Sequence, residues 1–349
     1  MKNNKGDFMK NIFVVYTPYH LYTIQKIIKT NDDNYLFIID NNSRLQDSLI
    51  LKKDMFNEII VINDISKLEK KETYKIFNIL YNIKKNIIRI GRVDKLHIFL
   101  DNNLIGQVFI KYVKKMYNSE VYLLEDGTGL YIKDDSLKKS KKLLIKKIIY
   151  KIFLLNSYKL INQGENEDVD FIYCNYPYLK NSNNNVKNIQ ELYIRDIHID
   201  IFKNKKIDLL ILTQPLSEDG FTKLYDEINL YKSIFKELQN RKIYLKLHPR
   251  EKIEKYQFIT EFENVSILEN SNMPIEAIIE NMNCNYIISI STSGILNIRK
   301  FKKIYIYPML ELKEKFDILL KQFENKEDLF IANDMVHLKS IIQQDYKDA

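Results

Sequence analysis

The sequence predicts an α/β protein with two doubly wound, Rossmann-like parallel sheets, one in each half of the chain. Short β-branched runs alternate with longer helical patterns nearly throughout the 349 residues. This alternation is typical of parallel sheets covered by helices on both faces. Hydrophobic residues make up 45% of the chain, and its length exceeds the ~250 to 300 residues at which single cores stop growing. We therefore expect two cores and two domains.

The candidate strands form two series along the chain. The first series comprises 12–16, 35–40, 58–62, 96–100, 120–124 and 171–174, and the second comprises 208–212, 242–246, 265–268, 286–290 and 303–307. Between them, residues 181–206 are rich in Asn and Asp and maintain no helical period. We place the boundary near residue 200, which predicts a first domain of 1–200 and a second of 201–349. Residues 337–346 predict a final amphipathic helix, and its return to the first domain is left open.

Composition excludes several classes of protein. Cys174 and Cys284 each lie in or beside an apolar run, which predicts buried free thiols rather than a disulfide or a cysteine zinc site. The apolar run at 12–15 is too short for a signal peptide, and no stretch approaches the ~20 apolar residues of a spanning helix. We therefore expect a cytoplasmic protein.

The net charge of +8 comes from 54 basic and 46 acidic residues that are interspersed. Without a recognition motif, this favours a solvated lysine-rich surface over a nucleic-acid surface, so no nucleic-acid partner is expected. Lysines are interleaved with leucines and isoleucines over 138–151. This segment is the candidate for peripheral association with anionic lipids on the inner face of the cell membrane. Its lysines are Lys138, Lys139, Lys141, Lys142, Lys146, Lys147 and Lys151.

Polar motifs follow two strands of the first half, and ligands of open α/β sheets bind beyond such carboxyl ends. After 12–16, Thr17 is either a helix cap or part of a ligand cleft. After 120–124, Glu125 and Asp126 are either solvated or capping residues, or a general base that takes a proton from an attacking sugar hydroxyl. Gly127 in the same turn would let a substrate approach closely.

The second half carries two such loops after its first two strands. After 208–212, the loop from Thr213 to Gly220 contains Gln214 and Asp219. Asp219 is either a helix-capping acid or a second candidate base. After 242–246, His248 precedes Pro249, which restricts its backbone and fixes where the ring points. Beside Lys246 and Arg250, this histidine could donate to a departing phosphate, or it could be structural.

Two further motifs complete the series in the second half. Glu276 lies in the first turn of a predicted helix, where a carboxylate either complements the helix dipole or accepts from a ribose diol. Ser291, Thr292 and Ser293 follow the strand at 286–290 and open another helix. Hydroxyls and free N–H groups there form an anion site. An ordinary cap explains one of these three residues but not all of them.

Taken in order, these motifs resemble those of the bacterial sialyltransferases, which share an acidic pair followed by glycine, a His-Pro motif and a Ser/Thr pair. The matching residues are Glu125-Asp126-Gly127, His248-Pro249 and Ser291-Thr292. Within this group the chain most resembles glycosyltransferase family 52, which includes lipooligosaccharide and capsule sialyltransferases. The spacing from His248 through Glu276 to Ser291 is also similar to that of the family.

The resemblance implies a GT-B architecture, with the nucleotide site across an interdomain cleft, and inverting transfer without a cofactor or essential metal. By the same resemblance, Glu125 or Asp126 is the base, with Glu125 preferred, and Asp219 is the alternative. His248 would donate to the CMP phosphate and Glu276 would hold the ribose. The phosphate-binding residues would be Ser291 and Thr292.

The implied partners are a CMP-sialic acid donor and a galactose-terminated glycan acceptor of lipooligosaccharide or capsule. A homodimer is compatible with the resembled family. The alternatives are a transferase for another CMP-activated ulosonic acid, a polysialyltransferase, or a non-catalytic protein that binds nucleotides or glycans. The motifs do not determine the acceptor or the linkage formed.

Overall fold

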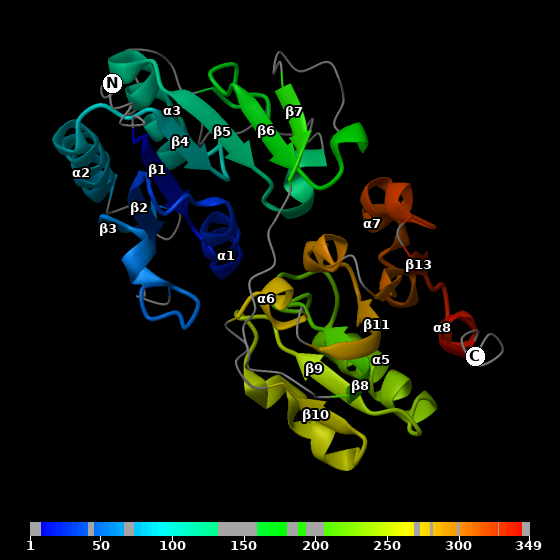
Figure 1. Cartoon of the computed structure of the whole chain (residues 1–349). Coiled ribbons are helices and arrows are strands. Elements are labelled where there is room, and N and C mark those ends of the chain that lie inside the picture. The colour runs from blue at the N-terminus through cyan, green and yellow to red at the C-terminus, as the bar shows by residue number, and fades with distance from the viewer. Residues whose placement is uncertain are drawn as a thin grey trace, which may run out of the picture. The chain divides into compact units, whose positions relative to one another are not determined.

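The computed structural model describes residues 8–40, 45–65, 73–131, 159–179, 188–192, 206–268, 273–279, 282–298, 301–326 and 328–343. The chain divides into two compact units, Met1–Asp196 and Ile197–Ala349. Each unit contains one sheet in which every strand pair is parallel (Figure 1). The predicted α/β class with two parallel sheets is confirmed.

The first unit holds a seven-stranded sheet in the order β3-β2-β1-β4-β5-β6-β7. The chain order reverses beside β1, as in Rossmann sheets, where ligands bind at the carboxyl edge of this switch point. The helices are α1 (Pro18–Ile27), α2 (Thr73–Ile90) and α3 (Leu104–Tyr117). The strands are β1 (Lys10–Val15), β2 (Asp33–Ile39), β3 (Glu58–Ile62), β4 (Lys95–Ile98), β5 (Glu120–Leu124), β6 (Phe171–Cys174) and β7 (Asn188–Glu191).

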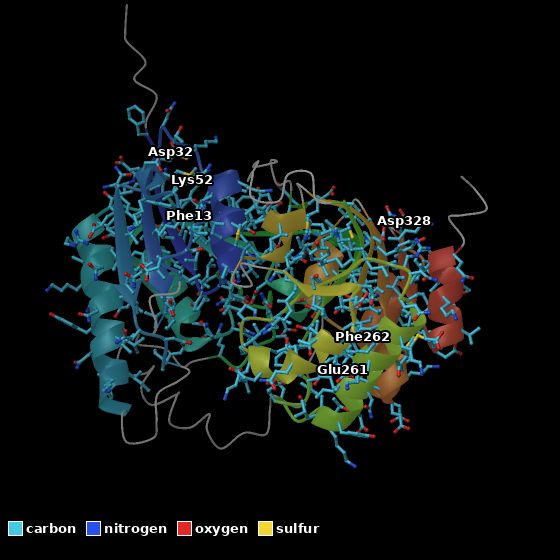
Figure 2. All side chains as sticks on the ribbon, turned by 90° about the horizontal axis from the view of Figure 1, so that it is seen from below. Phe13, Asp32, Lys52, Glu261, Phe262 and Asp328 are labelled. Atoms are coloured by element: carbon cyan, nitrogen blue, oxygen red, sulfur yellow. The ribbon has the colours of Figure 1, made fainter. Side chains whose placement is uncertain are left out.

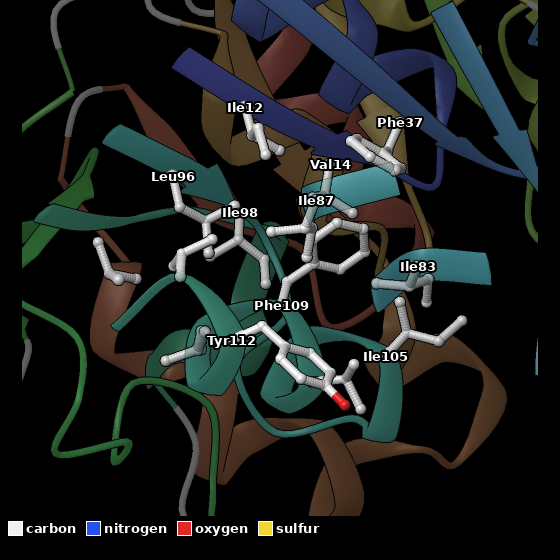
Figure 3. Packing of buried hydrophobic residues seen from close by; sticks show 14 of the residues in the cluster. Ile12, Val14, Phe37, Ile83, Ile87, Leu96, Ile98, Ile105, Phe109 and Tyr112 are labelled. Atoms are coloured by element: carbon white, nitrogen blue, oxygen red, sulfur yellow. The ribbon is translucent and has the colours of Figure 1, made fainter. Parts of the chain in front are cut away.

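The core of this unit lies between one sheet face and the helices α2 and α3. Val14 of β1 and Phe37 of β2 face Ile87 of α2 and Phe109 of α3, and all four are fully buried (Figure 3). Burial of each such side chain contributes about 1.5–3 kcal/mol relative to exposure. Successive strand residues point to opposite faces of a sheet, so the residues that alternate with Val14 and Phe37 lie on the second face.

The second face of the first sheet carries aromatic side chains. Phe13, labelled in Figure 2, stacks on His97 of β4 with ring centroids 4.6 Å apart. Burial lowers the pKa of His97 to about 3, so the imidazole is neutral and packs as an aromatic ring. Phe99, just after β4, lies at the carboxyl edge of the same face and contacts α1 through His20.

The second unit repeats this plan with a six-stranded sheet in the order β10-β9-β8-β11-β12-β13. Its reversal lies between β8 and β11. The strands are β8 (Lys206–Leu212), β9 (Ile243–Lys246), β10 (Val265–Ile267), β11 (Asn283–Ser289), β12 (Lys302–Tyr305) and β13 (Leu329–Ile331). The α-helices are α5 (Leu224–Glu237), α6 (Ile275–Ile279), α7 (Lys313–Leu320) and α8 (Met335–Gln343).

The last helix, α8, is attached to the second unit. The Tyr286 hydroxyl of β11 donates to the Ile342 carbonyl at 3.0 Å, and Lys339 pairs with Glu237 of α5 at 2.8 Å. Both contacts join α8 to the second unit, whereas the sequence left open its return to the first. Leu338, Ile341 and Ile342 are its buried residues, as the amphipathic pattern predicted.

All eleven predicted strands are present, with ends shifted by a few residues, and two edge strands were missed. β7 has the polar sequence Asn-Ile-Gln-Glu and lies within the stretch assigned to the domain boundary, and β13 has three residues. Edge strands need only one partner, so short or polar segments suffice. The lysine-rich segment 138–151 and most of 181–206 lie outside the described residues. Within the described ranges, no helix has the length and apolarity needed to cross a membrane.

Candidate functional site

Glu125 follows β5 and is buried in the first unit. Glu125 is 1% exposed. Its Oε2 accepts hydrogen bonds from the Tyr131 hydroxyl at 2.7 Å and from the Asn175 N–H at 2.5 Å. Burial raises the pKa of Glu125 to about 7, although the hydrogen bonds from Asn175 and Tyr131 oppose the rise. Through these hydrogen bonds, Glu125 connects the turn after β5 to the segment after β6.

Asp126 is oriented differently from its neighbour. Its Oδ1 lies 2.7 Å from Nε2 of His20 on α1, and its side chain is 32% exposed. His20 Nδ1 accepts the Tyr16 N–H at 3.1 Å, so in the neutral ring the proton is on Nε2 and His20 donates to Asp126. The His20 ring is fully buried and stacks on Phe99 with centroids 3.8 Å apart.

Two residues shape the backbone around this pair. The Thr17 hydroxyl caps α1 by accepting the His20 N–H at 3.2 Å, and the ligand-cleft interpretation of Thr17 stays a prediction. Thr17 thereby fixes the helical turn that carries His20. Gly127 has φ +62°, a left-handed conformation that glycine adopts without strain, and it turns the chain directly after Asp126.

In the second unit, Gln214 and Ser291 meet at the switch point between β8 and β11. Both the N–H and the hydroxyl of Ser291 donate to Gln214 Oε1, at 2.7 and 3.0 Å. Thr292 caps the short helix that begins at Ser293, and its N–H donates to the Ser289 hydroxyl at 3.2 Å. The predicted phosphate-binding donors of Ser291 are therefore held by a neutral amide oxygen.

His248 begins the turn after β9. Its N–H donates to Thr213 Oγ1 at 3.1 Å and to Glu251 Oε2 at 3.0 Å, and its Nδ1 accepts the Arg250 N–H at 3.2 Å. The neutral ring therefore carries its proton on Nε2. Burial and the nearby positive charge of Arg250 lower the pKa of His248. Pro249 follows directly and restricts the backbone of His248.

The same turn pairs Arg250 with Asp219. Two guanidinium nitrogens donate to the two carboxylate oxygens, each at 2.8 Å. This hydrogen-bonded pairing lowers the pKa of Asp219. A carboxylate held in this way has a weakened affinity for protons, so the geometry disfavours Asp219 as a general base.

Lys246 and Glu276 form a buried charged group at the end of β9. Burial lowers the pKa of Lys246 to about 8, and the negative charge of Glu276 opposes this effect. Glu276, in the first turn of α6, accepts from the Asn297 amide at 2.8 Å. The Asn297 amide therefore orients one carboxylate oxygen of Glu276.

Several of the residues that take part in these contacts were not identified from the sequence. The sequence patterns assigned no role to His20, Tyr131, Asn175, Glu251 or Asn297. No local signal marks them, because each acts through a contact made by folding. Among the described residues, no group of three or more His, Cys, Asp or Glu side chains could hold a metal ion.

Comparison with solved structures supports the fold. A 2,6-sialyltransferase of Photobacterium sp. JT-ISH-224, solved with CMP and lactose, is 12% identical with a TM-score of 0.52, covering 92% of this chain and 78% of that chain. A UDP-GlcNAc 2-epimerase of Neisseria meningitidis bound to UDP-GlcNAc is 10% identical with a TM-score of 0.53, covering 98% and 100%. At such low sequence identity, the structural similarity shows the fold alone. The fold that it shows is of the predicted GT-B type.

Comparison of sequences identifies the family. An uncharacterized protein of Haemophilus influenzae is 32% identical over 157 residues, which are 43% of this chain and 50% of that protein. The chain thus spans about half the length of that curated relative. A family model described as alpha-2,8-polysialyltransferase (POLYST) matches residues 11–306. This match supports the polysialyltransferase alternative from the sequence better than the first choice, family 52. Since it covers well over half of the chain, the protein belongs to the alpha-2,8-polysialyltransferase (POLYST) family.

Proposed function

We propose that this protein is an inverting sialyltransferase that moves sialic acid from CMP-sialic acid to a hydroxyl of a terminal sialic acid on a growing glycan. Membership of the polysialyltransferase family supports both the donor and this acceptor class. The observation that carries the chemistry is the partly exposed Asp126 carboxylate held by the buried His20. A carboxylate fixed in this way is suited to general-base catalysis.

Asp126, rather than the initially preferred Glu125, is the proposed base. A general base must be accessible to the substrate hydroxyl whose proton it takes. The Asp126 side chain is 32% exposed and His20 contacts its Oδ1, whereas Glu125 is 1% exposed and accepts from Tyr131 and Asn175. The acceptor hydroxyl would give its proton to Asp126 as its oxygen bonds to the anomeric carbon. The bond from that carbon to the CMP phosphate oxygen would break, with its electron pair leaving on the phosphate.

The second unit supplies the proposed donor site. The neutral His248 ring carries its proton on Nε2, which would donate to the phosphate as negative charge grows there. Lys246 adds a buried positive charge, and Glu276 with Asn297 would bind the ribose. A phosphate bound to Ser291 would take the place of Gln214 Oε1. A CMP donor carries one phosphate, so these groups would act without a metal.

The test is CMP release from CMP-sialic acid in the presence of EDTA. Oligosialic acid, lactose and no acceptor are compared, and CMP-Kdo serves as a second donor. The proposal predicts release that requires both CMP-sialic acid and oligosialic acid. Turnover with lactose alone would restore the galactose-type acceptor expected from the sequence. Turnover of CMP-Kdo alone would overturn the proposed donor, and CMP binding without any turnover would favour a non-catalytic protein.

A pair of variants assigns the base. Asp126→Asn keeps the size of the side chain and its contact with His20, so CMP binding should persist while turnover falls at least ~100-fold. Glu125→Gln can still accept from Tyr131 and Asn175 and should retain most of the turnover. The reverse pattern would restore Glu125 as the base.

A further inference from the structure

A buried ionic cluster lies behind the His248 turn, and Glu251 is at its centre. The Glu251 side chain is fully buried. Its Oε2 accepts from the Thr213 hydroxyl at 2.5 Å and from the His248 N–H at 3.0 Å. Its Oε1 accepts from Lys255 at 2.9 Å and from the Tyr256 hydroxyl at 2.7 Å. Four donors thus match the acceptor capacity of an ionised carboxylate.

Lys255 connects this cluster to two other segments. Its side chain is 5% exposed and contacts three carboxylates: Glu218 at 3.0 Å, Glu227 at 2.9 Å and Glu251 at 2.9 Å. Glu218 belongs to the loop after β8, and Glu227 to α5. Glu227 Oε2 also accepts the Ser217 N–H at 3.1 Å. One ammonium group therefore joins the loop after β8 to the turn after β9.

Stability alone is a weak explanation for this cluster. Three carboxylates share one lysine, and desolvation by burial raises the pKa of Glu227. Replacing buried ion pairs with apolar side chains of similar volume is often neutral or stabilising. A buried network of charges can instead serve to fix one conformation of the segments that it joins.

The contacts of Glu251 extend across the carboxyl edge of the second sheet. Glu251 binds Thr213, which follows β8, and His248, which follows β9. Gln214, next to Thr213, binds Ser291, which follows β11. The strands β9, β8 and β11 are neighbours in this sheet. These contacts therefore connect three of the loops that carry proposed donor-binding residues.

The geometry points to Glu251 as a positioning residue that holds His248 and the Thr213–Gln214 segment in place for binding of the nucleotide phosphate. This inference rests on the proposed function for the identity of the ligand. Glu251 does not touch the ligand itself, because all of its acceptor positions are occupied by the protein. It acts through the backbone N–H of His248 and through the hydroxyl of Thr213.

The charge of Glu251 also acts on the His248 ring. Four charged groups face this imidazole: Arg250 and Lys246 lower its pKa, and Glu251 and Asp219 raise it. Removing the charge of Glu251 should therefore lower the pKa of His248 further. This titration reports whether the Glu251 charge acts on the ring, and the CMP affinity reports whether the position that Glu251 imposes matters for binding.

The experiment compares Glu251→Gln with the wild type and with Glu261→Gln as a matched control. Glu261, labelled in Figure 2, is an exposed residue of the helical segment Ile253–Glu261, which follows the turn, and it pairs with Lys232 at 2.8 Å. Calorimetry measures the affinity for CMP, and steady-state kinetics with CMP-sialic acid give kcat and KM. NMR of the imidazole gives the pKa of His248. Thermal unfolding checks that each variant is folded.

We expect Glu251→Gln to weaken CMP binding about tenfold, which corresponds to roughly 1.4 kcal/mol. It should also raise KM for CMP-sialic acid more than it lowers kcat, and lower the pKa of His248, while Glu261→Gln resembles the wild type. A folded Glu251→Gln variant with unchanged CMP affinity would overturn the inference, whatever its His248 titration. If the wild type bound no CMP, the proposed donor would fail, but the His248 titration would still report whether Glu251 acts on this ring.

A second pair of variants covers the case in which Glu251→Gln does not fold. Thr213→Val removes the hydroxyl that joins Glu251 to His248, and Thr213→Ser retains it. Weaker CMP binding in the valine variant, with recovery in the serine variant, would support the positioning role. Equal CMP affinity in both variants would contradict it.

Discussion

His20 Nε2 lies 2.7 Å from Asp126 Oδ1, and the other ring nitrogen of His20 accepts the Tyr16 N–H at 3.1 Å. The contact with Tyr16 fixes the direction of the hydrogen bond between His20 and Asp126. Because Nδ1 is an acceptor, the neutral ring must donate from Nε2, so it can orient the carboxylate without taking the proton that a general base needs. The pair joins α1 to the turn after β5.

Replacing His20 should lower turnover while leaving CMP binding intact. His20→Phe keeps a ring that can stack on Phe99 but loses the donor to Asp126, so kcat should fall about tenfold or more. His20→Gln retains a side-chain donor and should lose less. Steady-state kinetics and CMP calorimetry measure the two effects. An equal loss in both variants, or a parallel loss of CMP affinity, would show that His20 acts only through folding.

Glu125 should make the stability of the protein depend on pH. Its folded-state pKa of about 7 exceeds the ordinary value of 4.5. The protonated form is therefore favoured in the folded state, and its stabilising contribution is complete below the unfolded pKa. That contribution is lost as the pH rises through the folded pKa. Thermal unfolding between pH 4.5 and 7 should depend less on pH in Glu125→Gln than in the wild type, and identical slopes would refute the burial argument.

Asp219→Asn should reduce turnover only slightly. The exposed pairing of Asp219 with Arg250 contributes little stability, since such surface pairs are worth about 0–1 kcal/mol. The lowered pKa of Asp219 also makes it a weak base. We therefore expect a change in kcat of less than about fivefold. A loss of ~100-fold with CMP affinity preserved would instead identify Asp219 as the base.

Gln214→Glu should weaken CMP binding. In the structure, Gln214 Oε1 accepts both donors of Ser291, which is where a phosphate oxygen is proposed to bind. A glutamate would place a negative charge on these donors and compete with the phosphate. Calorimetry should show at least an approximately tenfold weaker CMP affinity, with Gln214→Ala as the uncharged control. Unchanged affinity in the glutamate variant would place the phosphate away from Ser291.

Local sequence patterns were sufficient to predict the central strands of both sheets. The predicted runs 12–16 and 286–290 overlap the internal strands β1 and β11, because parallel strands buried on both faces are apolar over several residues. β7 escaped prediction because its sequence is polar, and β13 because it has only three residues; an edge strand, paired on one side only, tolerates both.

The sequence by itself determined the α/β class, the chain order of the motifs and their positions at strand ends, since these follow from periodicity and from residue type. It could not separate Glu125 from Asp126, which are adjacent carboxylates in the same turn. Only the tertiary structure buries one behind Tyr131 and Asn175 and pairs the other with His20. The partners are distant in sequence, so burial and hydrogen bonding, which decide the proton affinity of a carboxylate, arise only when the strands assemble.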